Sequence, residues 1–473
     1  MGTSYAISTK RSVIAFSLLS MKSRFLSHLF LQPRLMACYV VLNFALASHS
    51  PILAQEDSEN FIQQFYGRPK IQNCDESQTE GCVDYLLKNK SCVACNLKNT
   101  NLAEAKLENA NLTKAQLQEA SLENAILINS VLNEAQLEGI RLTGANLKKA
   151  KLKKATMPLS FLADTVFEEA DLTGVVATAA DFTNSNLKGA AITNGTLNGA
   201  TLINADLSQA TLESTAFREA DLSNAVLNES FAFKADFSDA NLSSAHLNSS
   251  NLIAAKFIGA NLENAKLENA KLSNSIFTKA DLINTRFTYA TLKNAVFQEA
   301  NLNGADLTGA DLDGADFRDA NLTRINLEGA NLKNALFDGA NLRGAVLIGA
   351  NLQGANLERG KLTGANLEGA NLDGANLQHA SLIGVNFQKA NLKNSDLTRS
   401  DPRQASFVGA NLVGANLKNA KLSGVNFSFS DLTNASLFSA LIDKAVFHQA
   451  ILANTVWIDG KTCLPSSIGN CDF

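Results

Sequence analysis

The five residues NLRGA at positions 341–345 return as NLEGA at positions 366–370, and close variants fill most of the 473-residue chain. From residue 97 to residue 457, a large apolar side chain falls on nearly every fifth position. The residue two before each of these positions is usually Ala, and the residue just before is often Asn or Asp. Polar residues follow, with Gly frequent at the second. We call the large apolar position the slot of each repeat.

A period of five fits neither common secondary structure. On an α-helix, five residues turn the chain by ~500°, so the slots would spread around the cylinder and bury no face. On a flat strand, residues five apart point to opposite faces. The pattern therefore requires a bend in every repeat, which brings all slots into one interior. Such a chain is a closed coil, and the middle of the molecule is expected to be all-β.

The phenylalanines predict the number of sides of this coil. They occupy slots that recur every 20 residues in two columns offset by ten, which indicates four repeats per turn and columns on opposite walls. At that count the chain forms about 18 coils, roughly 85–90 Å long at the ~4.8 Å strand spacing. Stacked rings on neighbouring coils are expected to form a core ladder. The ladder residues are Phe217, Phe237, Phe257, Phe277, Phe297, Phe317, Phe337, Phe387, Phe407, Phe427 and Phe447.

Three stretches depart from the pattern. Residues 156–180 are the weakest, Asp401-Pro402-Arg403 places proline in a slot, and Phe231-Ala232-Phe233 places alanine in one. Local bulges or loosened packing are expected there without a break, because the phase resumes each time. Elsewhere, Asn before the slot is expected to bond to the backbone of the neighbouring coil. Such a ladder is predicted for one column of asparagines: Asn241, Asn261, Asn301, Asn321 and Asn341.

The tandem A-(N/D)-L-x-x motif resembles the pentapeptide-repeat family over about three quarters of the chain. The resemblance implies a right-handed quadrilateral β-helix with Leu, Phe and Ala inside, and it says little about activity. Two flanking segments look like those of exported cyanobacterial members of the family. These segments begin at Cys92-Val93-Ala94-Cys95 and at Trp457-Ile458-Asp459-Gly460.

The first 54 residues read as a signal or leader peptide. Basic residues precede a short apolar run and small residues, with no acid before Glu56. An uncleaved anchor and an organelle transit peptide are the alternatives; the run is short for a span. Removing the leader removes five positive charges and changes the formal charge from −4 to about −9, which gives no reason to expect nucleic-acid binding. The expected location is the periplasm, the thylakoid lumen or the extracellular space, with no membrane span in the mature chain.

Four segments follow from these observations. They are a leader (1–54), an N-terminal cap with short helices (55–95), the β-helix (96–457) and a C-terminal cap (458–473). Caps are expected because an open solenoid exposes strand edges and core at both ends.

Beyond the leader, the cysteines lie only near the two ends of the repeat region, which suggests disulfides in an exported chain. Cys463 and Cys471 are expected to pair with each other. The other four, Cys74, Cys82, Cys92 and Cys95, allow three pairings within their segment, and a four-cysteine zinc site is the alternative. A redox role for the Cys92-x-x-Cys95 motif is the alternative to a structural one.

No residues assemble into a predicted catalytic, metal or cofactor site. His246, His379 and His448 occupy outward positions of separate coils and form no triad. An acidic cluster and a basic cluster are both interpreted as solvated surface. The alternative for the acidic cluster is cation binding, and the alternative for the basic cluster is partner binding. The acidic cluster is Asp306, Asp311, Asp313, Asp316 and Asp319, and the basic cluster is Lys148, Lys149, Lys151, Lys153 and Lys154.

The sequence therefore predicts a scaffold that is not an enzyme. Its partner would be a protein, a glycan or a component of the cell envelope, and it would be a monomer or an end-to-end assembly. The alternative is a DNA mimic, since one branch of the resembled family imitates duplex DNA and protects DNA gyrase. That branch needs dense negative charge, whereas lysines are interspersed here.

Overall fold

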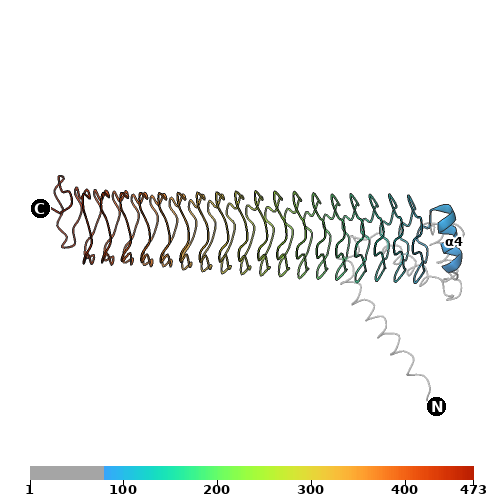
Figure 1. Cartoon of the computed structure of the whole chain (residues 1–473). Helices are drawn as coiled ribbons and strands as arrows, with labels where there is room; N and C mark the ends of the chain where they lie inside the picture. The colour runs from blue at the N-terminus through green and yellow to red at the C-terminus, as the bar shows by residue number, and fades with distance from the viewer. Residues whose placement is uncertain (1–78) are drawn as a thin grey trace, which may run out of the picture. The chain divides into compact units, whose positions relative to one another are not determined.

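The computed structural model describes residues 79–473. The predicted leader, Cys74 and the first part of the predicted N-terminal cap lie outside them. The chain divides into two units, residues 1–72 and 73–473, and everything described here belongs to the second. The one helix among the described residues is α4 (Thr79–Asn89), and the other described residues form a coil of bridged turns that runs from α4 to the C-terminus (Figure 1). None of the described residues form a helix with the length and hydropathy to cross a membrane.

The coil has a strict 20-residue register. Parallel bridges join each residue before a slot to the residue 20 positions later, from Ser91–Asn111 to Ser436–Val456. The first bridge lies one repeat before the predicted start at residue 96. A two-residue turn separates successive bridge positions throughout the repeats, so one coil contains four repeats and has four sides. No strand is longer than a single bridge residue, because a turn follows every slot.

Residues 241–245 show how this geometry satisfies the backbone. The N–H groups of Leu242 and Ser244 donate to carbonyls of the following coil at 2.6 and 2.8 Å, and that of Asn241 to the preceding coil at 2.9 Å. Ala245 closes the turn by donating to the carbonyl of Leu242 at 3.0 Å. The fifth N–H, of Ser243, donates to Oδ1 of Asn241 at 3.2 Å. All five donors are paired, which explains the preference for Asn or Asp before the slot.

The second turn residue of each repeat has a positive φ. Ser244 has φ 57°, and Gly344 at the same place in a later coil has φ 65°. Counted from the slot residue, this is the third of the four residues of a β-turn. A left-handed conformation at the third residue characterises a type II turn, and glycine adopts that conformation without steric cost. The glycine frequency noted in the sequence therefore comes from the turn. Leu159 adopts φ 54° without that freedom and is 61% exposed.

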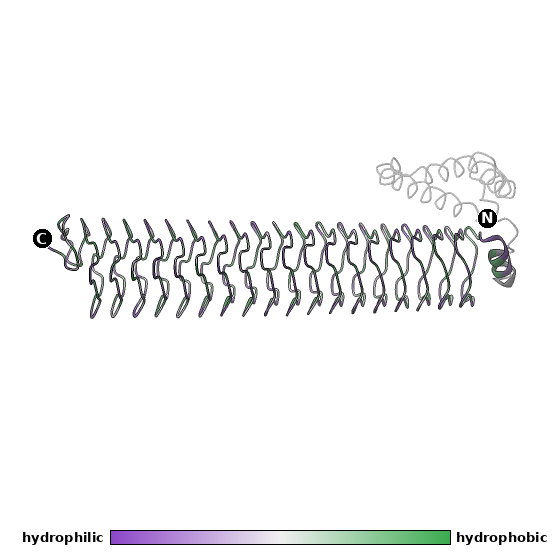
Figure 2. Cartoon of the chain, turned by 45° about the horizontal axis from the view of Figure 1, so that its top comes forward, coloured by the Kyte–Doolittle hydropathy of each residue, from purple (hydrophilic) through white to green (hydrophobic). Residues whose placement is uncertain are grey.

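The core consists of slot residues and the small residues two positions before them. These side chains are buried from Leu107 to Ala440, whereas the inward Thr100 and Ala105 of the first coil are half-buried. Phe217 and Phe237 stack at 5.1 Å with ring planes 1° apart, so they lie on one wall as the 20-residue period requires. The stack continues to Phe337, and a second stack runs from Phe387 to Phe447. Hydrophilic and hydrophobic residues accordingly alternate along every coil (Figure 2).

The three irregular stretches keep the coil and do not bulge. Bridges continue through residues 156–180, and Ala232 is fully buried in its slot. The expectation of local bulges is therefore wrong, because the register is set by the backbone and tolerates a smaller side chain. Pro402 has a local effect: the bridge from Asp401 to Lys421 is absent, since proline has no N–H to donate to that coil.

The C-terminal segment reverses direction and covers part of the last coil. Antiparallel bridges join Ile451 to Ile468 and Val456 to Thr462, in contrast to the parallel bridges everywhere else. Cys463 and Cys471 form a disulfide in this segment, and Cys463 is 1% exposed. Because this segment pairs in the antiparallel direction with the last coil, it protects that part of the edge from pairing with another chain.

Candidate interaction surfaces

The walls of the coil carry ladders of side-chain amides. In one column, Asn321 donates from Nδ2 to Oδ1 of Asn301 at 2.9 Å, and Asn341 donates to Oδ1 of Asn321 at 3.4 Å. The sequence predicted bonds to the neighbouring backbone instead. That part was wrong because the neighbouring carbonyls already accept backbone N–H groups. Oδ1 of Asn321 accepts from the N–H of Thr323 in its own turn, and its amide N–H donates to the side chain of the preceding coil, which fixes this side chain along the wall.

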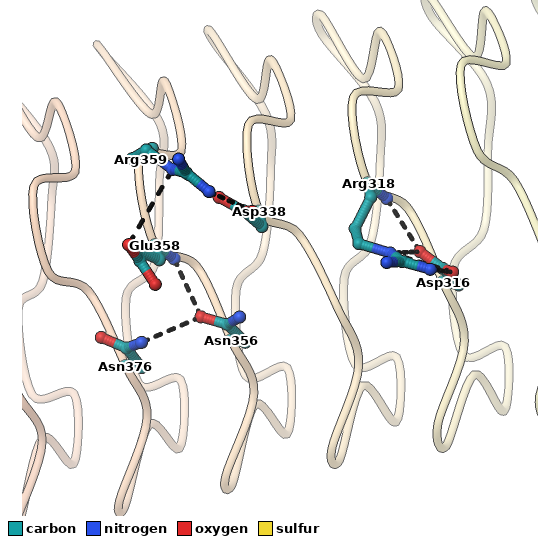
Figure 3. Close-up of polar contacts among 7 residues, drawn as sticks. All are labelled: Asp316, Arg318, Asp338, Asn356, Glu358, Arg359 and Asn376. Atoms are coloured by element: carbon teal, nitrogen blue, oxygen red, sulfur yellow. Dashed lines mark hydrogen bonds and ion pairs between the residues drawn. The ribbon is translucent and has the colours of Figure 1, made fainter.

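Charged side chains on the walls pair locally, as Figure 3 shows for two aspartates. Arg318 lies 2.6 Å from Asp316 on the same coil, and Arg359 lies 2.5 Å from Asp338 on the preceding coil. Burial raises the pKa of Asp316, but the hydrogen bonds from Arg318 outweigh it and hold that pKa below its usual value. Such exposed pairs add little stability, typically 0.2–1 kcal/mol each. Their consequence is a wall of alternating charge.

The basic cluster from the sequence is largely neutralised by the next coil. Lys148 pairs with Glu168 at 2.9 Å, Lys149 with Glu169 at 3.4 Å, and Lys153 with Asp171 at 3.2 Å. These are 18 or 20 residues apart, which is the separation of neighbours on adjacent coils. The structure thus gives three of the five lysines an intramolecular counter-ion.

The acidic cluster is divided among different walls. Asp306 and Asp316 are ten residues apart and therefore lie half a coil from each other. Asp311 pairs with Lys293 at 3.1 Å, and Asp316 accepts from Arg318. Among the described residues no group of three His, Cys, Asp or Glu side chains could hold a metal ion.

The three histidines lie on separate coils. His246 is half-buried on a wall, whereas His379 and His448 are exposed. His448 contacts the exposed ring of Phe429 edge-on at 5.4 Å. Neither His379 nor His448 is near the others in the 20-residue register.

The described cysteines near the start of the coil occupy interior positions. Cys92 fills a slot and Cys95 the small inward position of the next repeat, and the two form a disulfide. They are 2% and 4% exposed, and Cys82 of α4 is 1% exposed, with its carbonyl 3.9 Å from Sγ of Cys92. This disulfide was one of the open possibilities in the sequence, and it replaces Leu–Ala packing at the first bridged repeat.

The last coil differs from all earlier ones in exposing its core. The slot residues Ile442, Phe447 and Trp457 are only half-buried, while Leu441 and Val446 beside them are 61% and 46% exposed. No hydrogen bond from the backbone N–H of Ile442 or Phe447 occurs within the described residues, although each earlier slot N–H except that of Pro402 donates to the next coil. Because the reversed C-terminal segment covers residues 450–456, residues 441–449 remain an open edge, which we call the C-terminal edge.

A 20-residue parallel coil with four turns and an apolar axis defines a four-sided β-solenoid. Sequence profiles identify the family. One described as "Pentapeptide repeats (8 copies)" matches residues 91–129, 127–157, 162–199, 196–229, 235–274, 361–399 and 403–437. Another, described as "Pentapeptide repeat region", matches residues 270–347. These matches cover more than half of the chain, which therefore belongs to the pentapeptide-repeat family, whose members form right-handed quadrilateral β-helices.

Several solved structures are similar to this chain. HetL, a protein involved in heterocyst differentiation regulation in the cyanobacterium Nostoc sp. PCC 7120, is 32% identical, with coverage of 47% of this chain and 91% of HetL and a TM-score of 0.27. QnrB1, a plasmid-mediated fluoroquinolone resistance protein, is 22% identical, with coverage of 35% and 81% and a TM-score of 0.27. A pentapeptide repeat protein of the Arabidopsis thaliana thylakoid lumen is 24% identical, with coverage of 28% and 86% and a TM-score of 0.13. No curated protein matches the chain.

Proposed function

We propose that this protein is an exported, non-enzymatic scaffold that presents binding surfaces along a right-handed coil of about 18 turns. The observation that carries the proposal is the unbroken 20-residue register, which places outward side chains at a fixed spacing on four walls. Asparagine ladders and ion pairs hold those side chains in place, so a partner meets a preorganised surface. The alternation of acids with Lys and Arg weighs against the uniformly negative surface that a DNA mimic requires.

The proposed organisation follows the predicted segments. A leader (1–54) directs export, a cap (55–95) that includes α4 covers the first coil, and residues 458–473 form the other cap. Two disulfides support an oxidising compartment, because cytosolic thiols are kept reduced. The partner is a protein or an envelope component.

The C-terminal edge is the proposed site of end-to-end self-association. It combines unpaired backbone donors with exposed apolar side chains, and such an edge is a template for pairing with another chain. A second copy presents the same edge, so the two can pair across a two-fold axis. The reversed segment beside the edge limits the assembly to two copies at this end.

Two measurements test the proposal. The leader fused to a reporter should be exported, and a reporter that stays in the cytoplasm would overturn the exported scaffold. For self-association, sedimentation velocity should show the wild-type chain as a dimer and Val446→Lys as a monomer. The matched control is Val176→Lys, which adds the same charge at a 38% exposed wall position and should leave the dimer intact. A wild-type monomer at all concentrations would exclude the end-to-end contact.

A further inference from the structure

One wall of the coil contains a polar groove with a cavity volume of about 430 Å³. One side of the groove is formed by His246, Lys266 and Arg286, which are bridged to one another on three successive coils. The other side consists of turn residues from four successive coils. These are Asn224, Ser244, Asn264 and Asn284.

The cations of this groove differ from three of the lysines in the basic cluster. Lys148, Lys149 and Lys153 have a carboxylate of the next coil within 4 Å, but among the described residues Lys266 and Arg286 make no ion pair. Their backbones are one coil apart, or ~4.8 Å. Two positive charges are therefore held close together, and nothing within ion-pair distance neutralises them.

Two neighbouring groups modify the charge of the groove. Burial and the nearby Lys266 lower the pKa of His246, against an opposing effect of Glu268, so His246 is largely neutral at pH 7 and serves as a hydrogen-bonding group. Oε2 of Glu268 is buried and has no hydrogen-bond partner within the described residues. Glu268 is a carboxylate next to the cations in sequence. Its negative charge reduces the attraction of the groove for an anion.

The groove has defined ends and a second type of lining. In its column, His246 is bridged to Val226 on one side, and Arg286 is bridged to Asp306 on the other. The cationic stretch therefore spans the two coils of Lys266 and Arg286, beside the neutral His246, and suits two anionic groups, not a long polymer.

Opposite the cations, Nδ2 of Asn284 donates to Oδ1 of Asn264 at 3.4 Å. Side-chain amides both donate and accept, which suits sugar hydroxyls.

We propose that this groove binds a short stretch of an acidic polysaccharide. Carboxylate or sulfate groups on successive sugars contact Lys266 and Arg286, while hydroxyls bond to Asn264 and Asn284. One hexose is about as long as the coil spacing, so neighbouring sugars reach neighbouring coils. Single-stranded nucleic acid fits less well, because binding without sequence preference relies on aromatic stacking and the groove lining contains no Phe, Tyr or Trp.

This inference deepens the proposed scaffold role by naming a partner class for one wall. It is separable from the C-terminal edge, because residues 224–286 lie more than 150 positions away from residues 441–449. If glycan binding fails while the chain is exported and dimerises, the scaffold proposal stands and only this inference falls.

The experiment compares matched variants of the full chain by isothermal titration at pH 7 and low salt. The probes are oligogalacturonate for carboxylates, sulfated dextran oligosaccharides for sulfates, neutral dextran and single-stranded DNA. Lys266→Gln/Arg286→Gln should weaken acidic-glycan binding roughly tenfold. Lys256→Gln/Lys271→Gln is the control: it removes two exposed cations that also lack an ion pair among the described residues, and it should change the affinity less than twofold. Glu268→Gln should strengthen binding severalfold, because it removes the local negative charge.

The outcomes separate the explanations. A preference for oligogalacturonate or for the sulfated oligosaccharide identifies the anionic group, and either preference supports the proposal. Equal losses in the groove and control variants would reduce the site to non-specific attraction and overturn it. Tighter binding of DNA than of both acidic glycans would overturn the partner class. Unchanged circular dichroism and thermal unfolding of each variant show that a loss does not come from misfolding.

Discussion

The stacked phenylalanines allow a quantitative test of the core. Phe277 stacks on Phe257 at 4.8 Å and on Phe297 at 4.9 Å, and it meets Phe287 edge-on at 5.8 Å. Phe337, at the end of the same column, has one stacked partner, Phe317, at 5.0 Å. Both rings are fully buried, so substitution by Leu removes similar apolar area at each. Leu is also the residue that fills most other slots.

Phe277→Leu should therefore destabilise the coil more than Phe337→Leu. The difference is two ring contacts, and at ~0.5–1.5 kcal/mol per aromatic pair it amounts to roughly 1–3 kcal/mol. The cost of transfer and of the residual cavity is common to both variants and cancels in the comparison. Neither position is near an end of the repeat region, so fraying of the ends does not affect the stability of either variant.

The assay is equilibrium urea unfolding followed by far-UV circular dichroism, with the slope of the transition compared between variants. Equal slopes allow the free energies of unfolding to be subtracted, whereas a changed slope signals loss of cooperativity along the coil. A difference below about 0.5 kcal/mol, smaller than one aromatic pair, would refute the claim that ring stacking adds to burial in this core.

Three further predictions concern the walls and the ladder. Pro402→Leu should raise the melting temperature, because it restores an N–H donor toward Lys421 and gains about 1 kcal/mol; an unchanged or lower melting temperature would contradict this. Asn321→Ala should cost roughly 1–2 kcal/mol in urea unfolding through the lost ladder bonds to Asn301 and Asn341, and a neutral effect would deny the ladder a role in stability. The hydrogen bond from Arg403 lowers the pKa of Asp401 in the folded protein. The pair therefore contributes to stability above the pKa of an unfolded Asp, about 3.9, and this contribution is lost as the pH falls through the pKa of Asp401 in the folded protein. Arg403→Gln should accordingly be slightly less stable than wild type at pH 7 and equally stable in strong acid, where a persistent difference would exclude this pair as the cause.

The coil could be predicted from the sequence because its two periods point to the same geometry. The five-residue period requires a bend in each repeat, and the 20-residue recurrence of Phe217 and Phe237 sets four repeats per turn. Both are consequences of one steric condition, namely that every large side chain must reach the same axis. The proline at position 402 confirms how little each repeat contributes alone, since the loss of one donor leaves the coil unbroken.

The ends and the groove were less accessible from the sequence. The reversal that pairs Ile451 with Ile468 includes two turns, at residues 458–459 and 465–466, and residues 458–473 contain no repeat from which its register could be inferred. The cations of the groove carried a usable signal: His246, Lys266 and Arg286 align when the sequence is written in rows of 20. Their lack of counter-ions could not be deduced, because it depends on side-chain conformations of neighbours such as Glu268.

The proposed glycan groove lies on a regular part of the coil, and this has a consequence for its rigidity. The coils that contain residues 224–286 are built around the stacked rings of Phe217 to Phe277, whose planes deviate by at most 6°. A site gains affinity when its groups are held before the ligand arrives, because less conformational entropy is lost on binding. Loss of the Phe277 ring should thus weaken glycan binding less than loss of the two cations, since no lining residue is removed. If Phe277→Leu weakened binding as much as Lys266→Gln/Arg286→Gln at a temperature where the coil is folded, affinity would depend on core rigidity at least as strongly as on charge.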